Sequence, residues 1–146
     1  MTSINEYRAL FWQSDALYNS VMEQSGMPTS EYMTLYCISK GLNTQSAICK
    51  KLYMPKQTIN SAVKKFEKEG IISLCPTPDN DKLKTLALTK KGEALVREKV
   101  LAMDRVEEAV WLALSEEEQD KLVEITSKYN EILKDKVAVF LKNSAE

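Results

Sequence analysis

Residues 55–72 read PKQTINSAVKKFEKEGII, and this stretch decides the fold of the chain. Pro55 suits a first helical position, because proline lacks the N–H that would find no partner there. On a wheel of 3.6 residues per turn, the apolar side chains fall on one face: Ile59, Ala62, Val63 and Phe66. Gly70 ends the helix, and a β-prone run follows it. The stretch therefore predicts an amphipathic helix that packs on a core and exposes a polar face.

The polar face of this helix has the residue types that read DNA bases: Gln57, Asn60, Ser61, Lys64 and Lys68. Glutamine and asparagine pair bidentately with adenine, and lysine reaches guanine or phosphate. A shorter helical pattern opens at Thr44, with Ala47, Ile48 and Leu52 expected to face inward. Two such helices form a helix-turn-helix, whose second helix enters the major groove. A solvated amphipathic helix would show the same pattern, so the face alone does not decide the function.

A β-hairpin is predicted directly after the second helix. Residues 71–75 and 84–88 are β-prone and flank a loop at 76–82 that is rich in proline, aspartate and asparagine. A hairpin in this place is a wing, and Lys82 and Lys84 near its tip are suited to contact phosphate or the minor groove. An ordinary solvated hairpin explains this loop equally well by itself.

The charge of the chain is divided unevenly. Residues 44–91 carry ten lysines and four acidic residues, a net charge of about +6, whereas the whole chain carries −1. The remaining residues therefore sum to about −7. Clustered basic residues are the electrostatic signature of a protein that binds a polyanion. Helix-turn-helix, hairpin and local charge together favour DNA as the partner.

Long helices are predicted on both sides of this segment. One runs from Ile4 to about residues 26–28, and Thr29 or Ser30 is expected to cap the next. Thr89 caps a helix that continues to about Leu114, and Ser115 to Glu118 form a capping box that opens the last helix. The apolar surface of the long helices exceeds what a helix-turn-helix requires, which favours packing across a two-fold axis in a homodimer.

The predicted fold class is mainly α, a winged helix-turn-helix core with a small β-hairpin wing flanked by long N- and C-terminal dimerisation helices. Residues 29–89 form the winged helix-turn-helix, and residues 1–28 and 90–146 form the helical dimerisation region. We expect these parts to make one intertwined domain.

Several function classes are disfavoured by the composition. The chain has no histidine, no CxxC pair and no glycine-rich phosphate loop, so we expect no enzymatic activity, no cofactor and no metal site. The apolar runs are too short to span a membrane, and the N-terminus lacks the pattern of a signal peptide. Cys37, Cys49 and Cys75 are odd in number and widely spaced, which indicates reduced thiols and a cytoplasmic protein.

Two motifs resemble the MarR family of winged helix-turn-helix regulators. Residues 57–72 are similar to the recognition helix and glycine exit of that family, and Leu88-Thr89-Lys90-Lys91-Gly92 is similar to its step from wing to helix. The resemblance covers nearly the whole chain. It implies a homodimeric transcription factor, usually a repressor, that binds a pseudo-palindromic double-stranded operator.

The resemblance also implies which residues meet DNA. Gln57, Asn60, Ser61 and Lys64 are expected in the major groove, with Lys56, Thr58 and Lys65 nearer the backbone and Gln45 at a phosphate. The family commonly has Pro-x-Pro-x-Asp-Arg-Arg in the wing, where this chain has Pro76-Thr77-Pro78-Asp79-Asn80-Asp81-Lys82. An aspartate replaces the first arginine, so we expect a weaker wing, in part compensated by Lys84, and salt-sensitive binding.

Members of the family often respond to aromatic compounds bound between the dimerisation helices and the DNA-binding core. The aromatic residues suited to such a site are Tyr7, Phe11, Trp12, Tyr36 and Trp111, although aromatic residues at helical spacing are usually plain core. Two other functions stay open: a winged-helix module that binds a protein and no operator, and a thiol-based redox regulator. All three thiols lie on largely apolar elements, where we expect burial to shield them. Cys75 at the base of the wing is the best-placed thiol for redox sensing.

Overall fold

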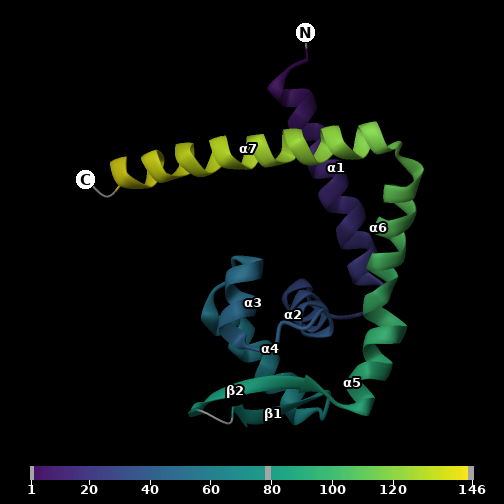
Figure 1. Ribbon diagram of the computed structural model, residues 1–146, viewed down its shortest axis with the longest axis vertical. Coiled ribbons are helices and arrows are strands. Elements are labelled where there is room, and N and C mark those ends of the chain that lie inside the picture. The colour runs from purple at the N-terminus through teal and green to yellow at the C-terminus, as the bar shows by residue number, and fades with distance from the viewer. Residues whose placement is uncertain (1, 78–79, 145–146) are drawn as a thin grey trace. The chain divides into compact units, whose positions relative to one another are not determined.

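The computed structural model describes residues 2–77 and 80–144, without the side chains of residues 80–83 (Figure 1). The chain divides into two compact units, residues 1–105 and residues 106–146, and the boundary falls within helix α6. Within the described residues, no helix combines the length and the apolar character needed to cross a membrane.

Helix α1 spans Ile4–Glu23 and begins with a capping box. The Ser3 hydroxyl accepts from the Glu6 N–H at 3.2 Å, and the Glu6 carboxylate accepts from the Ser3 N–H at 2.6 Å. The chain leaves the helix through Gly26, whose φ of 72° lies in the left-handed region. The predicted first helix is therefore confirmed. Of its residues, Met22 is buried against the core of the first unit.

Helices α2 (Thr29–Ser39), α3 (Gln45–Leu52) and α4 (Lys56–Lys68) enclose that core. The four apolar residues predicted for the inner face of α4 are all buried. They pack with Tyr32 and Leu35 of α2 and Ile48 of α3, each fully buried. The hydroxyl of Thr44 caps α3 as predicted, accepting from the Ala47 N–H at 3.2 Å.

Two of the predicted helix starts are corrected by the structure. Pro28 rather than Thr29 or Ser30 occupies the N-cap of α2, and Pro55 is the N-cap of α4 rather than its first helical residue. Both prolines have an extended backbone with ψ near 145° and 142°, which a cap position requires, whereas a first helical residue needs helical ψ.

Strands β1 (Ile72–Thr77) and β2 (Asn80–Leu88) form the antiparallel hairpin. The register pairs Ile72 with Leu88 and continues to Pro76 with Lys84, with a shift between Pro76 and Thr77. The expected loop at 76–82 is therefore too long, because much of it is paired in strands. Residues 78 and 79 of that expected loop lie outside the described part of the chain. The outer edge of β2 is held by the Leu86 N–H, which donates to the Asn43 carbonyl at 2.7 Å.

The hairpin, the end of α4 and helix α5 (Lys90–Leu95) meet at one tight junction. The Thr89 hydroxyl caps α5 by accepting from the Gly92 N–H at 3.1 Å, and it donates to the Gly70 carbonyl at 2.6 Å. The Thr89 N–H donates to the Ile71 carbonyl at 3.0 Å. A β-carbon added at Gly92 would lie only 2.0 Å from the same Ile71 oxygen. The close approach of α5 to the base of β1 therefore requires glycine.

The helix predicted from Thr89 to Leu114 is interrupted. Helix α5 passes into a π-helical turn, η1 (Val96–Val100), before α6 (Leu101–Ala113) continues. The wider turn lets the Leu101 N–H reach back to the Val96 carbonyl. The buried Tyr32 hydroxyl donates to the Val100 carbonyl at 2.7 Å, and Lys40 pairs with Asp104 at 2.5 Å. Helix α2 thus holds the π-helical turn and the start of α6.

The burial of the apolar residues along this interrupted helix changes with position. Val96, Val100 and Met103 are buried, but Val106 and Val110 are exposed. The last two residues lie beyond Arg105, in the second unit, outside the core that covers the first three.

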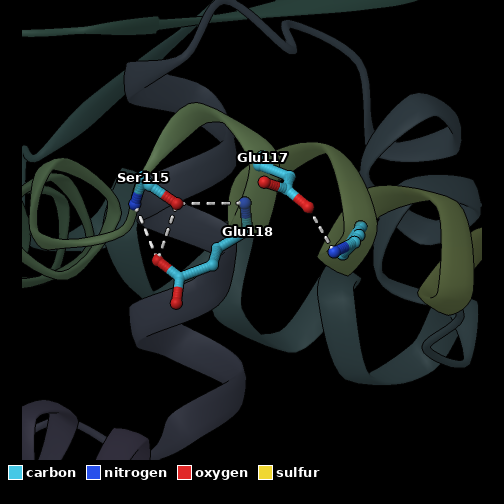
Figure 2. A network of polar contacts seen from close by, with 4 residues as sticks. Ser115, Glu117 and Glu118 are labelled. Carbon is cyan, nitrogen blue, oxygen red and sulfur yellow. Dashed lines mark hydrogen bonds and ion pairs between the residues drawn. The ribbon is translucent and has the colours of Figure 1, made fainter.

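Helix α7 (Glu116–Asn143) forms most of the second unit. Figure 2 shows the predicted capping box at its start, where the Ser115 hydroxyl and the Glu118 carboxylate each accept from the other residue's backbone N–H. These hydrogen bonds from Ser115 lower the pKa of Glu118. Glu117 pairs with Lys121 one turn later, at 2.5 Å. None of the residues of α7, all of them described, is buried.

Gly92→Ala is expected to destabilise the fold by about 1–3 kcal/mol, because the new methyl group must displace the Ile71 carbonyl and the start of α5. Chemical denaturation followed by circular dichroism measures this free energy of unfolding. Lys90→Ala, at an exposed position on the same turn, serves as the control and should change stability little. Equal stability of the two variants would contradict the close packing at Gly92.

Candidate nucleic-acid interface

The outward face of α4 is built as the sequence predicts. Gln57, Ser61, Lys64 and Lys68 are exposed, and Asn60 is half-buried at the edge of the face. The Ser61 hydroxyl donates to the Gln57 carbonyl at 2.9 Å, which leaves its oxygen lone pairs available as acceptors. The face therefore presents amide, hydroxyl and ammonium groups from a helix whose opposite side is fixed in the core.

The N-terminus of α4 is open to an anion. Within the described residues no side chain caps this end, and Pro55 supplies only its carbonyl to the first turn. The partial positive charge of a helix N-terminus adds to the charge of the exposed Lys56. A groove of about 640 Å³ runs alongside, and four of the predicted DNA-binding residues line it: Gln57, Thr58, Ser61 and Lys65.

Lys65 is held by a carboxylate from another helix. Its ammonium group lies 2.7 Å from the Glu31 carboxylate of α2, whose side chain is 15% exposed. The hydrogen bond to Glu31 raises the pKa of Lys65. Glu31 was not among the predicted site residues, because the partners are 34 positions apart in the sequence. In the structure Lys65 joins α4 to α2, and Glu31 places a negative charge in the groove beside the recognition face.

The remaining predicted DNA-binding residues lie on α3 and on the hairpin. Gln45 is the first residue of α3 and is half-buried, next to the Thr44 cap. Lys84 is exposed on β2, opposite Pro76. The side chain of Lys82 lies outside the described residues, as do those of Asn80 and Asp81. The weaker wing expected from these side chains stays a prediction.

The residues expected to contact an effector are spread over three helices. Tyr7, Phe11 and Trp12 are exposed on α1, and Tyr36 is half-buried on α2 against the core. Trp111 lies on α6 in the second unit and is 41% exposed. A separate pocket of about 340 Å³ in the first unit is lined by both apolar and charged residues. Its lining residues are Ser25, Met27, Glu31, Lys65, Phe66, Glu69, Ile71, Lys91, Leu95 and Lys99.

The three cysteines differ in exposure. Cys37 is buried, Cys49 is half-buried and Cys75 is exposed. Burial raises the pKa of the Cys37 thiol, and the nearby charge of Lys51 offsets part of this rise. The expectation that all three thiols are shielded on apolar elements is therefore wrong for Cys75, because alternate residues of a hairpin strand face solvent.

One further residue near the interface was missed by the sequence analysis. Tyr53, in the turn between α3 and α4, is 95% exposed and has a φ of 53°, the left-handed region. The sequence held one signal of this conformation. Tyr53 stands at the end of the first of two helices, where a left-handed residue is usually glycine or asparagine. Lys50 and Lys51, one turn earlier, are also exposed.

The comparisons with known proteins agree with this geometry. Residues 25–82 match the sequence model of the MarR family. This range contains α2, α3, α4, β1 and the start of β2. A comparison with curated proteins found no match.

Solved structures with the same fold cover nearly the whole chain. A MarR family regulator from Neisseria meningitidis superposes with a TM-score of 0.79 at 16% identity, covering 94% of this chain and 98% of its own. Staphylococcus aureus MepR in complex with DNA gives a TM-score of 0.70 at 23% identity, covering 90% and 96%. Bordetella bronchiseptica BpsR, whose DNA binding is regulated by 6-hydroxynicotinic acid, gives a TM-score of 0.65 at 15% identity. The match covers 88% of this chain and 93% of BpsR. The predicted winged helix-turn-helix fold is confirmed.

Glu31→Gln is expected to strengthen the binding of double-stranded DNA of arbitrary sequence, because it removes a negative charge from the groove beside α4 and frees Lys65. One added phosphate contact would steepen the dependence of log affinity on log salt by about 0.9. Fluorescence anisotropy of a labelled duplex, titrated at several salt concentrations, measures both quantities.

Glu117→Gln is the matched control, since it removes the carboxylate of an exposed ion pair with Lys121 on α7. It should leave DNA affinity unchanged. If Glu31→Gln instead weakens DNA binding, the ion pair acts by holding α4 in place and the masking of charge is refuted.

Proposed function

We propose that the protein is a homodimeric transcriptional repressor released by a small-molecule effector, because residues 25–82 match the sequence model of the MarR family. Its target is a pseudo-palindromic operator in double-stranded DNA. The observation that carries this proposal is the outward face of α4, which presents Gln57, Asn60, Ser61 and Lys64 from a rigid, well-packed helix. The structure of S. aureus MepR bound to DNA supports the same use of the fold here.

The chemistry of the α4 face supports sequence reading as well as charge attraction. The amides of Gln57 and Asn60 can each both donate and accept, as the edge of an adenine requires. Lys64 and Lys56 supply charge for guanine or phosphate. Gln45 at the start of α3 and Lys84 on the wing extend the contacts to the backbone on both sides of the groove. Lys65 is paired with Glu31, so its main role is to hold α4 against α2, and its charge contributes less to the attraction of DNA.

Exposed apolar side chains on the long helices support the dimer. On α1, Leu10, Phe11 and Trp12 are each more than half exposed. On α7, the large apolar residues recur along the whole length of the helix: Leu122, Val123, Ile125, Ile132, Leu133, Val137, Val139, Phe140 and Leu141. A second copy of the chain would remove this surface from water. A dimer also sets two recognition helices about 34–36 Å apart, the spacing of successive major grooves.

The effector part of the proposal is supported by BpsR, whose DNA binding responds to a small aromatic acid. Two sets of residues suit such a ligand in this chain. The first is the group of aromatic residues on α1, α2 and α6, and the second is the pocket between the α1–α2 loop, the end of α4 and α5. The pocket touches α4 directly through Lys65 and Phe66, and it touches the C-cap residue Glu69, so a ligand there would act on the recognition helix.

Two alternatives stay open under this proposal. A winged helix that binds a protein partner would use the same scaffold without reading bases. A redox regulator would use Cys75, the exposed thiol, which lies on β1 opposite Thr85 of the wing.

Asn60→Ala is expected to reduce discrimination between operator and scrambled DNA by roughly 1–3 kcal/mol, the value of one bidentate base contact. Lys64→Glu should abolish DNA binding altogether, because it puts a negative charge against the phosphates. Fluorescence anisotropy with labelled DNA from upstream of this protein's own gene, against scrambled competitor, measures both effects.

Lys128→Glu on α7 makes the same charge change as Lys64→Glu outside the basic segment and is the control. Unchanged discrimination in Asn60→Ala removes Asn60 from the reading face. DNA binding that survives Lys64→Glu would favour the protein-binding alternative.

The homodimer predicts a light-scattering mass of about twice the 16.6 kDa of one chain. Phe140→Glu should raise the dimer dissociation constant at least about tenfold, because it replaces the burial of a large apolar side chain with that of a charge. Lys142→Glu introduces the same carboxylate at a polar position of the same turn and should have little effect. A wild-type mass equal to one chain would refute the dimer.

A further inference from the structure

Tyr53 has a backbone conformation that its residue type does not favour. Its φ and ψ of 53° and 32° lie in the left-handed region, where glycine fits without strain and a bulky residue does not. The turn imposes this conformation, because the N–H groups of Tyr53 and Met54 both donate to the Cys49 carbonyl. The Tyr53 side chain is 95% exposed, so its packing does not offset the free energy of this strain. Left-handed backbone in a residue other than glycine is found more often at functional sites than elsewhere.

The surroundings of Tyr53 are cationic. Tyr53 lines a shallow hollow of about 420 Å³ together with Leu42, Ala47, Lys50 and Lys51. The sequence between Glu31 and Glu67 contains six lysines and no acidic residue. The hollow therefore offers an aromatic ring and two ammonium groups, which suit an anion with an apolar part. The sugar–phosphate backbone of DNA has both.

The position of Tyr53 fits that ligand. Tyr53 lies three residues before Lys56, the first residue of α4, so their Cα atoms are within about 11 Å of each other. The N-terminal part of a recognition helix is the part that meets the bases, in a major groove about 12 Å wide. A tyrosine this close to the start of α4 reaches the backbone that borders the groove.

We propose that Tyr53, with Lys50 and Lys51, forms a second contact to the DNA sugar–phosphate backbone, beside the α4 face and separate from the wing. The lysines bind phosphate, and the tyrosine ring packs on a deoxyribose while its hydroxyl donates to a phosphate oxygen. This inference rests on the proposed function, because it names a contact that only a DNA-binding protein makes. It supplies backbone anchoring in a chain whose wing has no arginine.

Substitution of Tyr53 by glycine separates the role in binding from the role in folding. Tyr53→Gly relieves the left-handed strain, so its midpoint of thermal unfolding should equal or exceed that of the wild type. Its affinity for DNA should nevertheless fall about tenfold, the size of one charge-assisted hydrogen bond. Tyr53→Phe keeps the ring and should give an affinity between those of the wild type and Tyr53→Gly.

The lysines are tested through the salt dependence of binding. The Lys50→Ala, Lys51→Ala double variant should reduce the slope of log affinity against log salt by about 0.9 for each phosphate that the variant no longer binds. The probe is a labelled duplex of about 30 base pairs and arbitrary sequence, because binding to the DNA backbone carries no sequence information. Lys128→Ala on α7 is the control, and its slope should match the wild type.

The outcomes distinguish this inference from the proposed function. If the wild type binds the duplex and Tyr53→Gly and the double lysine variant bind it with the same affinity and slope, the second contact is refuted and the proposed function stands. The hollow would then be free to hold an acidic protein. If the wild type shows no salt-dependent binding to this duplex or to the upstream DNA, the proposed function fails, and this inference fails with it.

Discussion

The contact between Gly92 and the Ile71 carbonyl is the constraint on which the winged helix-turn-helix depends. It brings the start of α5 against the base of β1, where Thr89 hydrogen-bonds to both Gly70 and Ile71. The Lys91 ammonium group donates to the Glu69 carbonyl at 2.7 Å and closes the same junction. The end of the recognition helix, the wing and the helix that leads to the second unit are therefore fixed together by a few backbone groups.

Helix α2 contacts elements on both sides of this junction in the chain. Glu31 binds Lys65 of the recognition helix, Tyr32 binds the Val100 carbonyl in the π-helical turn, and Lys40 binds Asp104 of α6. One side of α2 thus contacts α4, and another contacts the helix that continues toward residue 106. Any ligand that moves α2 acts on both. The hydroxyl of Tyr32 is fully buried, so its hydrogen bond to Val100 is also costly to break.

Much of the fold and part of the site were predictable from the sequence. Periodicity located the helices and the inner face of α4, and side chains that cap their own helix located the starts at Thr44, Thr89 and Ser115. The exposed polar face of α4 followed from the same period, because a helix that buries one apolar face exposes its opposite face to solvent. Lys65 was assigned to the backbone flank without its partner, and the strained Tyr53 was not assigned at all.

The sequence by itself determined whatever depends on neighbours within about four positions: helical period, caps, glycine exits and the basic character of residues 44–91. Only the tertiary structure decided the extent of the strands, the π-helical turn held by Tyr32, the pairing of Lys65 with Glu31, and the exposure of Cys75. Each of these arises from contacts between residues far apart in the chain, or from which side of an element the core covers. Local patterns carry no information about such contacts.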